Sequence, residues 1–261
     1  MQAPENVHDD LTLLTGVARA AGDIARPFWR AKARHWNKAD GTGPVSEADL
    51  AVNTMLHDRL LSARPDHGWL SEESLDDPVR LSRDRVFIVD PIDGTRAFID
   101  GQAAWSHSIA IAEHGRIIAG VVYLPVLDKI YAAALGRGAT LNDAPIRANA
   151  TTDPDGASML ASRPVLDAHN WQVPPGVTRH FRPSLAYRMC LVAEGRFDAM
   201  LALRRTWEWD IAAGALIVTE AGGTVSDRRG APLLFNNPVP QTDGTLSAAP
   251  VLHPRLIERL L

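Results

Sequence analysis

Hydrophobic and polar positions in the first sixty residues follow the period of an α-helix. Apolar residues recur three and four positions apart after Asp9 and Asp10, which predicts an amphipathic helix that is capped by these aspartates and runs to about Ala25. A second amphipathic helix is predicted to begin at Ser46. The apolar positions of the two predicted helices are Leu11, Leu14, Val17, Ala18, Ala21, Ile24, Met55, Leu56, Leu60 and Leu61.

Short apolar runs between turn residues predict a sheet in the rest of the first half. The consecutive apolar residues 86–89 suit a strand that is covered on both faces. Residues 106–112, 116–124 and 129–135 are apolar segments joined by short turns, a pattern typical of an antiparallel meander. The first half is therefore predicted to be α+β.

Helices and strands alternate again in the second half. Residues 141–155 lose periodicity and gather Asn, Asp, Thr and Pro, which favours a boundary between subdomains. We expect one unit of mixed α+β and α/β class, made of an α+β subdomain at residues 1–145 and an α/β subdomain at residues 146–261 that share a cleft. The elements predicted in the second half are strands at 158–162, 198–203 and 224–226 and helices at 185–194, 211–221 and 254–260.

Composition and charge narrow the range of partners. The 261 residues are 46% hydrophobic and 22% charged, which is typical of a globular protein. The net charge is −4 and no long basic run is present, so binding to a nucleic-acid polymer is disfavoured, whereas a small phosphorylated ligand is not. Cys190 is the only cysteine and cannot form an internal disulfide, which fits a reducing compartment. Because the chain shows neither a signal-peptide pattern nor an apolar stretch of about 18 residues, we expect a cytoplasmic protein without a membrane segment.

Candidate chemistry begins where the strand predicted at residues 86–89 leads into Asp90-Pro91-Ile92-Asp93-Gly94-Thr95. The proline restricts its own φ and the conformation of the preceding residue, and the glycine permits a backbone conformation closed to other residues, so local geometry directs the two carboxylates. Carboxylate oxygens at the end of a buried strand suit a hard divalent cation such as Mg²⁺. The alternative interpretation is a surface turn, because Asp, Pro and Gly are common turn residues.

Other acidic residues stand in similar contexts. Glu72 and Glu73 follow a short extended segment, Asp210 precedes a predicted helix, and Asp49 lies in the first turn of another. An acidic residue at a helix N-terminus suits a site for phosphate or a metal-bound anion. The structural alternatives are a solvated pair for the two glutamates, an N-cap for Asp210, and a capping box with Ser46 for Asp49.

The segments that contain these acidic residues follow one another in a recognisable order. They are Glu72-Glu73-Ser74, then Asp90-Pro91-Ile92-Asp93-Gly94-Thr95, then Trp209-Asp210-Ile211-Ala212-Ala213-Gly214 and Thr219-Glu220-Ala221-Gly222-Gly223. Together they resemble the inositol monophosphatase superfamily of magnesium-dependent, lithium-sensitive phosphomonoesterases, over about residues 43–224. The resemblance implies a layered α-β-α-β-α sandwich, roughly two or three Mg²⁺ ions in each active site, and a homodimer.

The resemblance also implies roles for the matching positions. The metal ligands would be the side chains of Glu72, Asp90, Asp93 and Asp210 and the backbone carbonyl of Ile92. The catalytic residues Asp49 and Thr95, with help from Glu72, would orient and deprotonate the attacking water. The backbone N–H groups of Gly94 and Thr95 would hold phosphate oxygens. Most ligands would thus come from residues 1–145, with Asp210 and further substrate contacts from residues 146–261.

Local departures from the family pattern bear on the substrate. Arg96 and the three residues after it replace the Asn-Phe-x-His that is usual in inositol-specific members, and Leu203 stands where those members tend to place a glutamate that holds inositol hydroxyls. The segments around Ser162 and Arg188 resemble 3′(2′),5′-bisphosphate nucleotidases, and a second phosphate would explain the cationic side chains. We therefore favour hydrolysis of 3′-phosphoadenosine 5′-phosphate to AMP and phosphate. The predicted substrate contacts are Gly94, Thr95, Ser162, Arg163, Arg188 and Asp210.

Other interpretations stay open. Within the same superfamily they are an inositol-1-monophosphatase, a histidinol-phosphate phosphatase or a broad sugar phosphatase. A protein of another class would be a non-catalytic regulator that binds metal, which is disfavoured because every predicted ligand is present. For Arg163 and Arg188 the alternative is a solvated surface charge.

Overall fold

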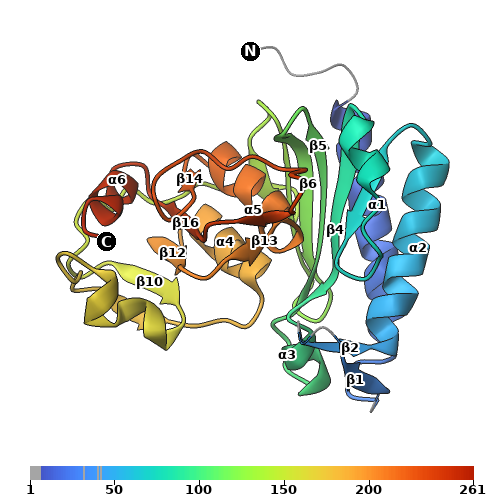
Figure 1. The fold of residues 1–261 in the computed structure, drawn as a ribbon, viewed down its shortest axis with the longest axis horizontal. Coiled ribbons are helices and arrows are strands. Elements are labelled where there is room, and N and C mark those ends of the chain that lie inside the picture. Colours follow the sequence, from blue (N-terminus) through green and yellow to red (C-terminus); the bar gives the residue numbers. More distant parts are fainter. Residues whose placement is uncertain (1–6, 32, 40, 42) are drawn as a thin grey trace.

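The computed structural model describes residues 7–31, 33–39, 41 and 43–261 (Figure 1). In this part of the chain the larger sheet has seven strands in the order β3-β4-β5-β6-β7-β8-β9. β3 and β4 are parallel, and every later neighbour pair is antiparallel, so the predicted meander is confirmed. The strands are β3 (Gly68–Ser71), β4 (Arg85–Asp93), β5 (Ser106–Glu113), β6 (Arg116–Leu124), β7 (Lys129–Ala134), β8 (Ala139–Leu141) and β9 (Ala144–Pro145).

Two long helices, α1 (Val7–Ala25) and α2 (Glu47–Ala63), cover the outer face of this sheet (Figure 1). Their apolar stripes pack on alternate residues of β4 to β6 in one buried cluster, as helical periodicity predicts. The predicted aspartate cap is wrong, because α1 already includes both aspartates. Asp10 is buried instead, and its carboxylate accepts hydrogen bonds from Arg64 (3.0 Å) and Arg85 (3.1 Å).

A small hairpin and a short helix lie at the lower edge of the first sheet in Figure 1. The hairpin consists of β1 (His35–Asn37) and β2 (Pro44–Ser46), and α3 (Thr95–Ile99) follows β4 directly. The sequence pattern did not predict the hairpin, because β1 is exposed along its whole length and lacks an apolar face. The hairpin leads into α2 through Ser46, the predicted start of that helix.

The second half of the described chain forms a five-stranded sheet in the order β11-β10-β12-β16-β14. One face of this sheet packs on α6 (Leu252–Ile257), through Met159 and Leu201 among others, while Leu160 and Met200 face the opposite way. The strands are β10 (Ser158–Ala161), β11 (Thr178–His180), β12 (Ala199–Ala202), β14 (Thr224–Ser226) and β16 (Thr245–Ala248), with a separate pair β13 (Thr206–Trp207) and β15 (Gln241–Thr242), and the 3₁₀ segments are η1 (Pro78–Ser82), η2 (Arg163–Leu166) and η3 (Ala168–Asn170).

Two helices, α4 (Leu185–Ala193) and α5 (Glu208–Glu220), fill the space between the sheets (Figure 1). Their buried cluster joins Ile88 of β4 to Met200 of β12, so one core extends across both halves of the chain. α5 approaches β6 closely, since a Cβ on Gly120 would lie 3.0 Å from Cα of Ala213. The layers are therefore helix, sheet, helix, sheet, helix, and the expected sandwich is confirmed.

Several element boundaries differ from the prediction. β4 continues through Asp93, so the two aspartates Asp90 and Asp93 lie on an irregular strand and not in a surface turn. α5 begins at Glu208, so Asp210 lies in its first turn and is not an N-cap. The last helix begins at Leu252, because Pro254 is accommodated in its first turn, where its missing N–H is not needed.

The sheets divide the chain near the predicted boundary, since β9 ends at Pro145 and β10 begins at Ser158. We propose that residues 1–145 and 146–261 are two subdomains of one unit. Cys190 is buried. None of the helices in the described chain combines the length and the apolar character that crossing a membrane requires.

Candidate active site

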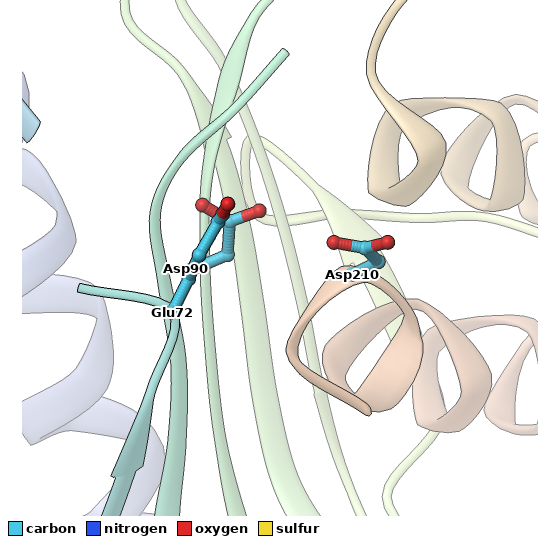
Figure 2. Close-up of side chains that lie close together, drawn as sticks. All are labelled: Glu72, Asp90 and Asp210. Atoms are coloured by element: carbon cyan, nitrogen blue, oxygen red, sulfur yellow. The ribbon is translucent and has the colours of Figure 1, made fainter. Parts of the chain in front are cut away.

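Three carboxylates from separate elements meet between the first sheet and α5 (Figure 2). Glu72 follows β3, Asp90 lies on β4 and Asp210 lies in the first turn of α5. One oxygen of each carboxylate lies within 4.8 Å of the other two. Figure 2 shows Glu72 and Asp90 side by side, with Asp210 facing them from the helix. The fold thus brings together residues separated by up to 138 positions in the sequence.

An irregularity in β4 determines how the backbone runs between Asp90 and Asp93. The register with β5 shifts between Asp90 and Asp93, as at a β-bulge, which redirects side chains at the end of a strand. The carbonyl of Pro91 inside the bulge is hydrogen-bonded to Nδ1 of the buried His107. Burial lowers the pKa of His107 to about 4, so its ring is neutral and donates from Nδ1 to that carbonyl. The bulge is therefore fixed by local packing.

The cluster is electrostatically suited to a cation. Asp90 is 1% exposed, and its Oδ1 has no hydrogen-bond partner among the described residues. Burial raises the pKa of Asp90 well above the usual range, and the neighbouring carboxylates of Glu72, Asp93 and Asp210 raise it further. Burial and the charges of Asp93 and Glu72 raise the pKa of Asp210 in the same way. Buried, mutually repelling oxygen donors of this kind fit a hard divalent cation.

Asp93 is held by α4. Its Oδ2 accepts hydrogen bonds from Oγ of Ser184 (2.6 Å) and from the backbone N–H of Ala186 (2.7 Å). Burial raises its pKa, and these hydrogen bonds oppose the rise. Asp93 lines the same cavity as the other three carboxylates, although it is not part of their tightest group. Ile92 also lines this cavity.

Asp49 makes the hydrogen bonds of both arrangements that the sequence presented as alternatives. Its Oδ2 accepts hydrogen bonds from the backbone N–H and from Oγ of Ser46, as in a capping box. Its Oδ1 accepts from Oγ1 of Thr95 at 3.1 Å, and the same hydroxyl lies 3.0 Å from the carbonyl oxygen of Ile92. Burial raises the pKa of Asp49 to about 6. A carboxyl group with a pKa near neutrality is suited to proton transfer.

Gly94 has the backbone conformation that the sequence predicted. Its φ of 94° lies in the left-handed region, which favours glycine, and it precedes α3. A side chain at this position would lie 3.5 Å from the backbone nitrogen of Ser184. The turn therefore directs the backbone at Gly94 and Thr95 toward the cavity that both residues line.

Lys38, which no sequence pattern predicted to be part of the site, lies between the two strands of the hairpin. Its Nζ lies 2.8 Å from Oε1 of Glu72 and 2.7 Å from Oε1 of Glu73. These two carboxylates raise the pKa of Lys38 although burial opposes the rise. Burial raises the pKa of Glu73 to about 7. No sequence signal marked Lys38, because it belongs to an exposed polar segment that only the fold brings to the carboxylates.

The carboxylates line a cavity of about 780 Å³ that extends toward the second sheet. Arg188 in its wall is buried, so it is not a solvated surface charge. Its guanidinium lies over the ring of Phe181, 4.4 Å from the centroid, and burial lowers its pKa to about 10. Ser162 lines the cavity too, whereas Arg163 is exposed and the wall continues through Pro164. Further residues of the wall are Arg96, Leu203, Arg204, Trp207 and Arg228.

Comparison with known proteins agrees with this geometry. The model of the inositol monophosphatase family matches residues 7–261. The chain belongs to the inositol monophosphatase family. The 3′(2′),5′-bisphosphate nucleotidase CysQ of Escherichia coli O157:H7 is 36% identical over 225 residues, which are 83% of this chain and 90% of that protein. Inositol monophosphatase 2 of Solanum lycopersicum is 31% identical over 226 residues, 82% of this chain and 85% of that protein.

Solved structures of the family share the fold. The IMPase of Thermotoga maritima superposes with a TM-score of 0.83 at 27% identity, covering 96% of each chain. The predicted resemblance and the predicted enzyme class are both confirmed, and the chain is a phosphatase, a hydrolase of phosphate monoesters. Inositol monophosphatases are generally metal-dependent, which agrees with the acidic cluster.

Proposed function

We propose that this inositol monophosphatase family member is a Mg²⁺-dependent phosphomonoesterase that hydrolyses 3′-phosphoadenosine 5′-phosphate to AMP and phosphate. The observation that carries the proposal is the convergence of Glu72, Asp90 and Asp210 in a cavity whose other wall holds arginines. The carboxylates suit the metal and the arginines suit a second phosphate group. The similarity to a bisphosphate nucleotidase at 36% identity supports the same substrate class.

The proposed ligands for Mg²⁺ are the carboxylates of Glu72, Asp90, Asp93 and Asp210 and the carbonyl of Ile92. The unpartnered Oδ1 of Asp90 and the raised pKa values of Asp90 and Asp210 are the features that fit this donor set. When bound, roughly two or three Mg²⁺ ions would neutralise charge that develops on the phosphoryl oxygens and lower the pKa of water.

We assign removal of the proton from the attacking water to Thr95 and Asp49. Oγ1 of Thr95 can donate its proton to Asp49 and accept one from the attacking water, while Glu72 orients that water. The capping hydrogen bonds from Ser46 keep Oδ1 of Asp49 directed at Thr95. The N–H groups of Gly94 and Thr95 hold the phosphate during this transfer.

Choice of the leaving group is assigned to the wall formed by the second half of the chain. Leu203 presents an apolar side chain to the cavity, where it offers no hydrogen bond to the hydroxyls of an inositol ring. Burial lowers the pKa of Arg188 most strongly; the charge of Asp93 opposes this effect, and repulsion from the charge of Arg204 adds to it. An anionic group between the two guanidinium groups would relieve the repulsion, which suits the 5′-phosphate of the proposed substrate. Ser162, Arg163 and Asp210 complete the proposed contacts.

The test is a comparison of kcat/KM for 3′-phosphoadenosine 5′-phosphate, inositol 1-phosphate and histidinol phosphate on the purified protein with Mg²⁺. We expect the bisphosphorylated nucleotide to be preferred by about 10²-fold, because a site built for a polar group rejects analogues that leave its charges unpaired. A preference for either of the other two esters would overturn the substrate. Absence of Mg²⁺-dependent phosphate release from a broad panel of esters would overturn the metal mechanism as well.

The second candidate is an inositol monophosphatase. It is favoured by the 31% identity to inositol monophosphatase 2 of Solanum lycopersicum and by the structural similarity to the IMPase of Thermotoga maritima. The same comparison of substrates distinguishes the two.

We further propose that the enzyme is cytoplasmic, is inhibited by lithium and forms a homodimer. Light scattering of the purified protein and inhibition by LiCl test the last two points.

A further inference from the structure

A buried hydrogen-bonded network connects the two sides of the carboxylate cluster. Glu208 is the first residue of α5, lies two positions before Asp210 and is fully buried. Its carboxylate accepts from the backbone N–H groups of Asn236 (2.6 Å) and Asn237 (3.0 Å) and from Nδ2 of Asn237 (2.7 Å). Burial raises its pKa, and these hydrogen bonds oppose the rise.

The same two asparagines contact a buried cation from the first half of the chain. Arg80 in η1 is 2% exposed, and it donates from Nη1 to Oδ1 of Asn236 (2.6 Å) and from Nη2 to the carbonyl of Asn237 (2.9 Å). Its remaining bonds go to both oxygens of Asp76. Asn236 has a φ of 61°, in the left-handed region that asparagine tolerates better than most residues. The loop residues Asn236 and Asn237 thus form hydrogen bonds with both the buried carboxylate of Glu208 and the buried guanidinium of Arg80.

Both ends of this network are tied to proposed metal ligands. A Cβ on Gly68 of β3 would lie only 3.0 Å from Cα of Arg80, so η1 packs tightly on the strand that ends just before Glu72. At the other end, Glu208 and Asp210 share the first turn of α5. Glu72 and Asp210 therefore stand on elements that Arg80, the two asparagines and Glu208 hold together.

We propose that the network of Arg80, Asn236, Asn237 and Glu208, here named the brace, fixes the separation between Glu72 and Asp210 and so sets the affinity of the cluster for divalent cations. These four are positioning residues, and none of them lines the cavity that the carboxylates share. The proposal rests on the metal ligands of the proposed function. Groups that hold metal ligands in place typically change metal affinity by about 10-fold to 100-fold when they are altered.

The experiment measures Mg²⁺ binding to the Glu208→Gln and Asn237→Ala variants by calorimetric titration in the absence of substrate. Glu208→Gln keeps the size of the side chain but removes its charge, and Asn237→Ala removes one amide of the brace. We expect the dissociation constant for Mg²⁺ to rise by about 10-fold for Glu208→Gln and by less for Asn237→Ala. At saturating Mg²⁺ we expect kcat to stay within about threefold of the unmodified enzyme, since the catalytic groups are intact.

The matched control is Glu194→Gln. Glu194 is a largely buried carboxylate that accepts from Lys129 and from the hydroxyl of Tyr131 (2.8 Å), outside the brace. This control is expected to lower the melting temperature as the brace variants do while leaving the affinity for Mg²⁺ unchanged. If Glu208→Gln does not fold, Asn237→Ala supplies the answer, because it keeps both buried charges.

The outcomes separate the brace from the proposed function. Folded brace variants that bind Mg²⁺ within twofold of the unmodified protein would overturn the brace alone. An equal loss of affinity in Glu194→Gln would also overturn it, because the effect would then follow from general destabilisation. If the unmodified protein fails to bind Mg²⁺, the metal assignment falls first, and the brace falls with it.

Discussion

Lys38 places a permanent positive charge against the carboxylates that we assign to Mg²⁺. Its Nζ contacts Oε1 of Glu72, which is also a proposed metal ligand. An ammonium group and a divalent cation would therefore compete for the same carboxylate. At the scale of single residues, Lys38 is thus a counter-ion that balances the cluster when fewer cations are bound.

Replacing Lys38 with Met is expected to strengthen Mg²⁺ binding by about fivefold, because the proposed ligand Glu72 loses its ammonium partner and an ion pair of this kind is worth about 1 kcal/mol. The measurement is the Mg²⁺ concentration that gives half-maximal activity. Lys129→Met is the matched control, since Lys129 also pairs with a glutamate, Glu194, but outside the cluster. Weaker Mg²⁺ binding in Lys38→Met would show that the lysine supports the site rather than competing with the cation.

Asp210→Asn and Asp93→Asn test the ligand assignment directly. Each removes a negative charge while keeping the shape of the side chain, so we expect kcat to fall by about 10²-fold or more with little change in the melting temperature. Asp155→Asn, in an exposed ion pair with Arg259, is the control that should leave kcat unchanged. Near-normal turnover of Asp93→Asn at saturating Mg²⁺ would remove that residue from the set of ligands.

At the scale of elements, the turn between β4 and α3 fixes the backbone that is proposed to hold phosphate. Its geometry depends on the left-handed φ of 94° at Gly94. The closest atoms to an added Cβ lie at 3.5 Å, which is ordinary contact, so a substitution here would be strained by its backbone conformation and not by lack of space. This separates the effect of the turn from the effect of packing.

Gly94→Ala is therefore expected to destabilise the protein by about 1–2 kcal/mol. It should also lower kcat by about 10²-fold, because the N–H groups that follow the turn would be displaced. Gly156, with a φ of 89° and open space around it, offers the comparison. Urea denaturation should show a similar loss of stability for Gly156→Ala, and the phosphatase assay should show no loss of activity. Equal activities of the two variants would argue against backbone capture of phosphate.

The sequence predicted elements where one face is apolar and failed where tertiary contacts decide. The stripes of α1 and α2 and the meander from β5 to β7 were predicted correctly, because each buries a periodic apolar face. The start of α5 was placed too late, since Glu208 enters the helix only because Asn236 and Asn237 satisfy its buried carboxylate. The hairpin of β1 and β2 gave no signal because β1 is exposed.

The same limit applies to the candidate site. Local spacing and resemblance identified the acidic motifs, including the position at Gly94 that needs a left-handed backbone. They gave no distance between Glu72 and Asp210, because that distance depends on how α5 packs across the first sheet. Nor could they identify Lys38, whose part in the site arises only from contacts between segments remote in the sequence.

At the scale of the whole molecule, the acidic cluster makes stability depend on pH. Burial raises the folded-state pKa of Asp49 to about 6 and that of Glu73 to about 7, above the values of the same groups in an unfolded chain. Between about pH 4 and pH 7 the folded state therefore binds more protons than the unfolded state. Stability from these groups is fully present below pH 4 and is lost as the pH rises through 6 and 7.

Without divalent cations, the melting temperature is expected to fall between pH 5 and pH 8, because Asp49 and Glu73 together lose about 4 kcal/mol of stability over this range. Mg²⁺ should oppose the fall, because its carboxylate ligands must be deprotonated, so the stabilisation that it gives grows over the same range. Scanning calorimetry with EDTA and with Mg²⁺ checks both trends. Glu73→Gln should flatten the profile in EDTA, and a melting temperature that rises with pH in EDTA would contradict the sign.

The position of α5 in the chain has a consequence for biosynthesis. This helix packs against β6 at Gly120, yet in the sequence it comes after β10, β11 and β12, the first three strands of the second sheet. A nascent chain that has emerged only as far as β9 already carries Glu72, Asp90 and Asp93 but lacks Asp210. The proposed set of metal ligands is therefore complete only after α5 has been synthesised.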